Sequence, residues 1–148
     1  MMEEKSKYLI KQYPKIFSEN FYFECGDGWF NLIDTLCKDL QHRIDWKLKK
    51  ASDEERENLQ IKCAQCKEKF GGLRFYVYGG DEYMQGMISF AESMSYKICE
   101  GCGLPGKSYN DGWIRTNCES CEVKYQERRA ARFSESSGTL VANKDDSK

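Results

Sequence analysis

Residues 59–80, with the sequence LQIKCAQCKEKFGGLRFYVYGG, set the architecture of the chain. Apolar residues occupy alternate positions in both halves of this stretch: Leu59, Ile61, Cys63, Leu73, Phe75 and Val77. A period of two places such side chains on one face of an extended strand. The stretch therefore predicts a β-hairpin that turns at the glycine pair 71–72 and ends at the pair 79–80. On a regular strand, Cys63 and Cys66 point to opposite faces.

Two segments beside the hairpin have the spacing of amphipathic helices. Their apolar residues recur at steps of three and four: Trp29, Ile33, Leu36, Cys37, Leu40, Ile44 and Leu48 in the first, and Met84, Met87, Ile88, Ala91, Met94 and Ile98 in the second. This spacing predicts helices at 29–48 and 81–98, each of which needs an apolar surface to pack on. We therefore expect an α+β fold over residues 1–98, in which two main amphipathic helices pack on a β-hairpin.

Shorter signals complete the N-terminal part of the chain. Residues 3–13 predict a helix that ends at Pro14. The charged residues 49–58 predict either a solvated helix end or a connector. Asp27 is expected to cap the helix that follows it, and Trp29 is expected to lie in the core.

Four cysteines near the C-terminus have the spacing of a zinc site. Two residues separate Cys99 from Cys102 and Cys118 from Cys121, and fifteen residues lie between the two pairs. Two tight turns of this kind place four thiolates around one ion in tetrahedral geometry. Because four protein ligands leave no open position for water, we expect one structural Zn²⁺ ion rather than a catalytic one.

The chain after residue 98 is expected to be a small zinc-ribbon-like module. This module covers residues 99–133 and ends with a polar helix at 119–133. Residues 134–148, with the sequence SESSGTLVANKDDSK, contain no aromatic residue and are expected to be a disordered tail.

The chain has eight cysteines, and the other four leave three interpretations open. Cys63 and Cys66 can supply a knuckle to a site with the first pair of the zinc module. Alternatively, they form a second metal site with Cys25 and Cys37. The third interpretation is that all four are buried free thiols, since free cysteine behaves as a small hydrophobe. Cys37, on the apolar stripe of its predicted helix, fits the third interpretation best.

The composition excludes several classes of protein. With 148 residues, 23 Lys+Arg and 24 Asp+Glu, the net charge is −1, which excludes a generally basic protein that coats nucleic acid. The single histidine, His42, excludes active sites built on several histidines. The N-terminus lacks the apolar region of a signal peptide, and no apolar run approaches the ~20 residues of a membrane span. We therefore expect no membrane association, and a cytoplasmic protein with reduced thiols.

Five runs of residues together form a recognisable pattern. They are YPKIF at 13–17, CGDGW at 25–29, KEKFGGLRFY at 67–76, CEGCGLPG at 99–106 and GWIRTNC at 112–118. Over roughly residues 8–121, the chain resembles a family of small phage and prophage proteins. The resemblance implies a phage or prophage setting and a bacterial host cytoplasm, and it implies no reaction. An aliphatic residue is usual in that pattern where this chain has Cys66, which argues against a metal role for Cys66.

The polar face of the predicted hairpin is a candidate binding surface. It has Lys62, Arg74, Tyr76 and Tyr78, and cations of this kind bind phosphate while aromatic rings stack on bases. The alternative is that a helix or the zinc module covers this face and that the tyrosines belong to the core.

Two further groups of side chains are candidates for contact with a partner. Trp113 and Arg115 lie on the segment that leads to Cys118, where a zinc ribbon presents a strand edge. The alternative for Trp113 is that it packs against the zinc site. The last predicted helix has four cations near one face: Lys124, Arg128, Arg129 and Arg132. These cations are either a solvated face or a nucleic-acid contact.

Three hypotheses for the function follow from these features. We expect a non-catalytic binding or inhibitor protein that acts on a host protein, for example in host defence. The alternative is a nucleic-acid or nucleotide binding protein that uses the Arg/Tyr face of the hairpin. A metal-dependent enzyme is the third hypothesis, although no motif in the chain assigns a catalytic residue.

Overall fold

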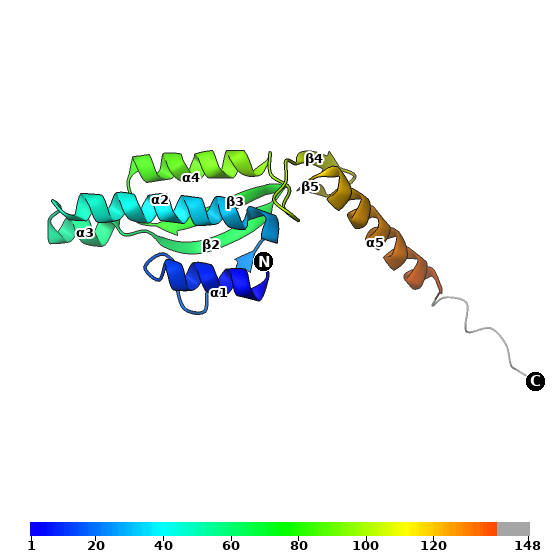
Figure 1. The fold of residues 1–148 in the computed structure, drawn as a ribbon, viewed down its shortest axis with the longest axis horizontal. Coiled ribbons are helices and arrows are strands. Elements are labelled where there is room, and N and C mark those ends of the chain that lie inside the picture. Colours follow the sequence, from blue (N-terminus) through cyan, green and yellow to red (C-terminus); the bar gives the residue numbers. More distant parts are fainter. Residues whose placement is uncertain (139–148) are drawn as a thin grey trace, which may run out of the picture.

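The computed structural model describes residues 1–138 and has a mixed α and β fold (Figure 1). Its elements, in chain order, are α1 (Glu3–Gln12), β1 (Phe23–Glu24), the 3₁₀ helix η1 (Asp27–Trp29), α2 (Phe30–Leu48), α3 (Asp53–Leu59), β2 (Lys62–Lys69), β3 (Gly72–Tyr78), α4 (Glu82–Ser95), β4 (Lys107–Asn110), β5 (Ile114–Asn117) and α5 (Glu119–Gly138). The first eight elements, from α1 to α4 and including η1, form a body, and β4, β5 and α5 follow at one end of it (Figure 1).

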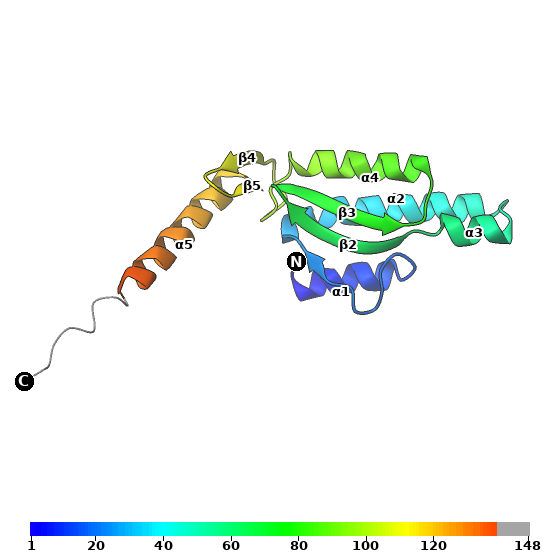
Figure 2. The same cartoon turned by 180° about the vertical axis from the view of Figure 1, so that it is seen from behind.

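The body has a three-stranded sheet with the order β1-β2-β3. β2 and β3 form the expected antiparallel hairpin, and β1 adds a short parallel strand that places Phe23 opposite Cys66. Helices α2 and α4 lie on one face of the sheet (Figure 1). Seen from behind, β2 and β3 lie in front of α2, and no described element crosses them (Figure 2). The sheet therefore has one packed face and one open face.

Helix α4 also closes the outer edge of the sheet. The backbone N–H of Leu73 donates to Ser95 Oγ at 2.8 Å, and the N–H of Phe75 donates to Glu92 Oε1 at 2.8 Å. These two donors on β3 have no neighbouring strand, and an unpaired strand edge invites association with other chains. Side chains of α4 thus accept hydrogen bonds from two backbone N–H groups of the edge strand β3, within the same molecule.

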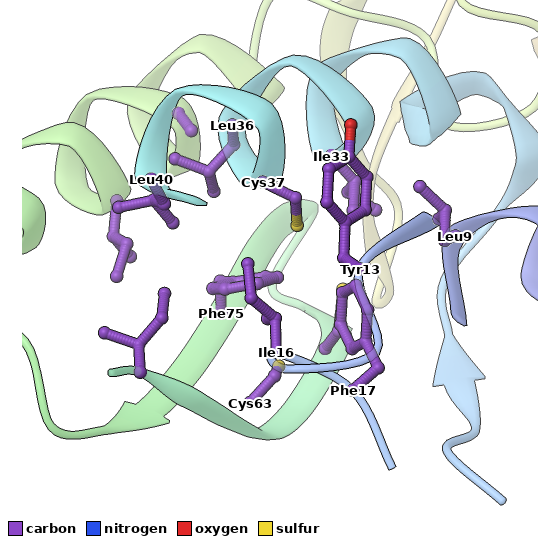
Figure 3. Packing of buried hydrophobic residues seen from close by; sticks show 14 of the residues in the cluster. Leu9, Tyr13, Ile16, Phe17, Ile33, Leu36, Cys37, Leu40, Cys63 and Phe75 are labelled. Carbon is purple, nitrogen blue, oxygen red and sulfur yellow. The ribbon is translucent and has the colours of Figure 1, made fainter. Parts of the chain in front are cut away.

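The core lies between the sheet and the helices α1, α2 and α4 (Figure 3). Trp29 is fully buried, as expected, and the buried residues of α2 are those of the predicted stripe: Ile33, Leu36, Cys37, Leu40 and Ile44. Figure 3 shows the thiol of Cys37 directed from α2 toward Phe75 and the sheet. The helical spacing in the sequence therefore identified the packing face of α2 correctly.

The hairpin turn lies one residue earlier than the sequence predicts. Lys69 pairs with Gly72, so the turn consists of Phe70 and Gly71, whose φ angles are 53° and 76°. Two consecutive positive φ angles are typical of the type I′ turn, which matches the twist of the flanking strands. Gly72 begins β3 instead, and a Cβ atom there would lie 2.3 Å from the ring of Tyr96.

The register of β2 contains an irregularity that the alternation did not reveal. Cys63 pairs with Val77 and Gln65 pairs with Tyr76, so the strand has one extra residue between them. Such a β-bulge shifts the alternation of side chains by one position. Cys63 and Cys66 are both buried as a result. The expectation that these two thiols point to opposite faces was wrong.

Two predictions at the ends of elements also need correction. The charged run contains a separate helix, α3, which Ser52 and Glu55 begin with a reciprocal capping box. Residues 134–138 continue α5 rather than belonging to the predicted tail. The remainder of that tail, 139–148, lies outside the described residues.

Candidate metal centre

Four thiols meet beyond the end of the body. The Sγ atoms of Cys99, Cys102, Cys118 and Cys121 all lie within 4.8 Å of one another. The Sγ atoms of Cys102 and Cys118 are 3.6 Å apart, close to the ~3.8 Å that a tetrahedron with metal–sulfur bonds of about 2.3 Å requires. The four predicted ligands therefore form a group that can hold one metal ion.

Backbone hydrogen bonds shape the first pair of ligands into a tight turn. The N–H of Gly103 donates to Cys99 O at 2.9 Å, and the N–H of Cys99 donates to Leu104 O at 2.7 Å. Gly103 has a φ of 83°, a conformation that residues with a Cβ atom rarely adopt. A Cβ atom on Gly101 would lie 3.2 Å from Cys121 Sγ. The glycines of this run thus allow the turn to close around the ion.

The second pair of ligands lies at the start of helix α5. The N–H of Glu122 donates to Cys118 O at 3.0 Å, and Ser120 Oγ lies 3.2 Å from Cys118 Sγ. The Ser120 hydroxyl and the N–H of Cys121 lower the pKa of the Cys118 thiol to about 6. Partial burial and the neighbouring thiols raise the pKa of Cys121 to about 12. A bound cation supplies the positive charge that favours the thiolate form of all four ligands.

The CGDGW run packs directly on the metal knuckle, which is the turn at 99–104 that contains Cys99 and Cys102. The N–H of Gly28 donates to Glu100 O at 2.7 Å, and the N–H of Gly26 donates to Glu100 Oε1 at 2.8 Å. A Cβ atom on Gly28 would lie only 2.0 Å from Cys99 O, so no larger residue fits there without moving the backbone. The indole N–H of Trp29 donates to Ile98 O at 2.9 Å. The loop before α2 is therefore the docking surface for the metal module.

The hairpin turn of the body forms the other half of this junction. Thr116 Oγ1, on β5, donates to Gly71 O at 2.6 Å. The N–H of Glu100 donates to Thr116 O at 2.9 Å and so joins the knuckle to the same strand. The FGG run, the CGDGW run and the first CxxC pair, which are distant in sequence, therefore meet at one place. In the sequence they are separate features, and only their common richness in glycine indicates a close approach of backbones.

Behind the metal ligands, Arg115 is buried in a network of ion pairs. Its guanidinium donates to both carboxylate oxygens of Glu122 and to Asp111 Oδ1 at 2.6 Å, and it lies 4.0 Å from the centre of the Tyr125 ring. Asp111 also pairs with Arg129. These contacts lower the pKa of Glu122 to about 2 and hold the pKa of Asp111 well below its usual range. The prediction that Arg115 is a surface contact residue was wrong, since its charge is used inside the module.

A scan of the chain against protein-family models matches no family, and searches of curated proteins and of solved structures find no match either. The function of the protein is therefore inferred from the contacts of its own residues.

The remaining thiols do not join a metal site in the described part of the chain. Cys25, Cys37, Cys63 and Cys66 are all buried in the body, and the group near α5 is the one set of three or more potential ligands found among the described residues. Burial raises the pKa of Cys63 to about 12 and also raises the pKa values of Cys37 and Cys66. Protonated buried thiols of this kind match the third interpretation of the sequence, that of free core cysteines.

The candidate residues of the hairpin face are exposed, but their cations are partly engaged. Tyr76 and Tyr78 are 44% and 73% exposed, and Lys62 is exposed beside them. The alternative that another element covers this face is therefore wrong for the described residues. The guanidinium of Arg74, however, donates to Leu73 O and to the hydroxyl of Tyr96. Of the two cations predicted for this face, only Lys62 has no such partner among the described residues.

Trp113 lies apart from the hairpin face, in the loop between β4 and β5, and is 62% exposed. It lines a shallow groove together with Tyr125 and Arg128 of α5. None of the described helices has both the length and the apolar composition needed to cross a membrane.

Proposed function

We propose that this protein is a non-catalytic binding protein whose C-terminal part is a zinc-ribbon-like module held by one structural zinc ion. The observation that carries this proposal is the closed set of four thiols at a junction between two parts of the fold. Four thiolates in tetrahedral geometry favour zinc or an iron–sulfur centre. With all four positions taken by protein ligands, the ion has a structural role, and the module needs it because it has little core of its own.

Elemental analysis and native mass spectrometry test the metal. We expect one zinc ion per chain, and we expect Cys118→Ser to lose it, whereas Cys37→Ser, in the core of the body, retains it. A brown protein that contains iron would contradict the assignment of zinc. Two zinc ions per chain would contradict the assignment of the remaining cysteines as free thiols.

A surface on the outer side of α2 and α4 supports a protein as the partner. Trp46, Tyr83 and Phe90 are 56%, 61% and 68% exposed there. They line two adjoining hollows of about 390 and 540 Å³ that share Asp39, Tyr83 and Met87. Exposed aromatic side chains around an apolar groove are typical of protein–protein interfaces, where they contribute much of the binding energy.

A cation at one end of this groove indicates the chemistry of the partner. The guanidinium of Arg43 lies 5.7 Å from the ring of Trp46 and 4.5 Å from that of Tyr83. Its Nε atom is buried and has no hydrogen-bond partner. The same guanidinium has one long ion pair, with Asp81 at 3.8 Å, and a carboxylate in the groove would give it a second anionic partner. The proposed occupant is therefore a segment of a host protein with an apolar side and an acidic residue.

A pull-down from host lysate, with and without nuclease, tests this part of the proposal. We expect one captured protein in both arms, lost with the variant Trp46→Ala/Phe90→Ala and retained with Tyr22→Ala. Tyr22 is a matched control because it is 75% exposed and lies outside the groove. Capture that persists in the groove variant would contradict the assignment of this surface.

The setting of the proposal rests on the resemblance to phage and prophage proteins, which implies a bacterial host cytoplasm. The alternative function, nucleic-acid or nucleotide binding on the hairpin face, has less support. Arg115 is buried in the metal module and Arg74 is engaged with Tyr96, so that face retains few free cations.

A further inference from the structure

Helix α5 extends away from the body (Figures 1 and 2). A groove lies along one side of this helix. The part nearest the metal ligands has a volume of about 330 Å³ and is lined by Trp113, Lys124, Tyr125 and Arg128 among others. The next part has a volume of about 610 Å³, shares Tyr125 and Arg128 with the first, and adds Arg132. The two parts therefore form one continuous groove.

Three cations of this groove have no acidic partner among the described residues. Lys124, Arg128 and Arg132 follow each other at steps of four residues, which places them on one side of the helix about 6 Å apart along its axis. Glu100 lines the inner part of the groove, where its carboxylate accepts the N–H of Gly26. Two further acids are occupied by other cations, since Glu122 pairs with Arg115 and Asp111 pairs with Arg115 and Arg129. The ion-pair network therefore leaves this side of α5 with a row of free positive charge.

Neutralisation of the negative charge at the metal centre does not explain the whole row of cations. Four thiolates and one divalent cation have a net charge of −2, and Lys124 lies one turn from the ligand Cys121. Arg132, in contrast, follows Cys121 by eleven residues, or about 16 Å along the helix. That distance exceeds the ~8 Å over which physiological salt screens exposed charges. The outer part of the row thus has no local charge to neutralise.

Aromatic rings lie beside these cations. Trp113 is 62% exposed, and Tyr125 is half-buried with its ring held against the guanidinium of Arg115. A row of cations flanked by rings is the arrangement that binds single-stranded nucleic acid, because cations bind the phosphates and rings stack on unpaired bases. A duplex keeps its bases stacked internally and would not use the rings.

We infer that the groove formed by Trp113, Tyr125, Lys124, Arg128 and Arg132 is a binding site for single-stranded nucleic acid. This site is distinct from the proposed protein-binding surface on α2 and α4, and it goes beyond that function. Arg115 is a positioning residue here, since it orients the ring of Tyr125 without reaching the groove's cations. The contacts are to phosphate and to base faces, so the site selects unpaired strands without a preference for their sequence.

Fluorescence anisotropy with the zinc-loaded full chain tests this inference. The probes are labelled single-stranded DNA and RNA oligonucleotides of mixed sequence, and the matching duplexes, in ~50 mM salt. We expect the single strands to bind more tightly than the duplexes, with a log–log salt slope of about −2, since each of three phosphate contacts contributes about −0.7. The two single-stranded arms show whether the ribose hydroxyl matters.

Substitutions distinguish binding in the groove from nonspecific attraction between the nucleic acid and the charge of the whole protein. Arg128→Glu/Arg132→Glu should weaken binding at least about tenfold and flatten the salt slope. Lys11→Glu/Lys38→Glu makes the same change of net charge on exposed residues of α1 and α2 and should leave the affinity within about twofold. Trp113→Ala should weaken binding about fivefold or more through lost stacking. Arg132→Glu alone remains informative if the double variant releases zinc, because Arg132 is remote from the ligands.

Several results would overturn the inference. These are an equal loss of affinity in the Lys11/Lys38 control, preferential binding of duplexes, equally tight binding of poly-glutamate, or no binding at low salt. Loss of nucleic-acid binding with an intact host-protein pull-down would leave the protein-partner proposal standing, and the reverse pattern would leave this site standing.

Discussion

The burial of Arg115 shows how one side chain can organise a small module. Arg115 is 5% exposed, and its guanidinium contacts two carboxylates and the face of Tyr125. Buried ion pairs contribute little compared with apolar packing, but removing one partner leaves an uncompensated charge. The network therefore makes the module depend strongly on this residue.

We predict that Arg115→Met destabilises the zinc-loaded protein by about 3 kcal/mol, because it leaves Glu122 buried without its cation. Urea unfolding followed by circular dichroism measures the change. Arg56→Met is the matched control, since the Arg56 side chain has an exposed ion pair with Asp53 and an exposed hydrogen bond to Ala51 O, and we expect a change below about 0.5 kcal/mol. Equal effects of the two substitutions would contradict the structural role of Arg115.

Two glycines offer an opposite pair of predictions. Gly28→Ala should cost about 2–3 kcal/mol, because its Cβ atom would collide with the backbone of Cys99 and overpack the junction. Gly86→Ala should stabilise the protein by about 1 kcal/mol, because Gly86 lies within α4 with open space around it. Thermal or urea unfolding of both variants checks the pair. A Gly28→Ala protein as stable as the parent would show that the junction is loose.

Individual residues show where sequence reasoning succeeds and where it stops. The metal ligands were predictable because their spacing alone brings thiols together on tight turns. The burial of Arg115 was not, because its partners Asp111 and Glu122 lie on two other segments. The role of Gly28 was equally hidden, since its neighbour Cys99 is distant in the sequence and only the fold brings the two together.

The bulge in β2 changes the environment of two thiols and leads to a prediction about reactivity. Cys63 and Cys66 both face the core, where burial raises their pKa values. The thiolate is the reactive form, so these residues should not react at pH 8 in the folded protein. With Ellman's reagent and a chelator, we expect the four ligand thiols to react. The other four of the eight should need denaturant. More than four reactive thiols before denaturation would contradict this assignment.

The start of α4 gives a prediction about pH. Burial alone would raise the pKa of Asp81, but hydrogen bonds from Lys47 and from the N–H of Met84, with the charges of Lys47 and Arg43, hold it below the ordinary value of 3.8. A lowered folded-state pKa means that the stabilisation is present above the unfolded pKa and is lost as pH falls through the folded one. Asp81→Asn should therefore cost about 0.5–1 kcal/mol at pH 7.

Urea unfolding of both proteins between pH 7 and pH 3 tests that prediction. The difference between parent and variant should stay constant down to about pH 4 and then shrink, since the parent's carboxylate becomes protonated. Loss of the metal at low pH affects both proteins equally and cancels in the difference. A difference that grows on acidification would contradict the assigned direction of the shift.

At the level of helices and strands, the long periodic segments were predictable and the short ones were not. Helix α2 has its apolar stripe in the sequence because one face packs on the sheet. Strand β1 has only two residues, Phe23 and Glu24, and exists because it pairs with β2. No local pattern of two residues indicates a strand. The bulge at residue 64 was hidden for a similar reason, since the pairing with β3 determines it.

At the scale of the whole molecule, the candidate metal site lies at one end only. We predict that chelation increases hydrogen exchange in residues 99–121 and in the loop at 26–29, while the core of α2, β2 and β3 keeps its protection. The body has its own apolar core, whereas the contacts of the module are a few hydrogen bonds and the four thiols that can hold an ion. Hydrogen-exchange mass spectrometry with and without chelator measures this. Uniform loss of protection would mean that the ion holds the body together as well.

The position of the junction also bears on how the chain matures during its synthesis. The residues of the body that contact the metal module at this junction, from Gly26 to Gly71, are translated before Cys99, so the body can fold while the rest is still being made. Cys121 follows Cys99 by 22 residues, which at 5–20 residues per second takes about 1 to 4 s. Binding of one ion by all four thiols therefore requires that Cys121 has been made, which is later than every residue of the body.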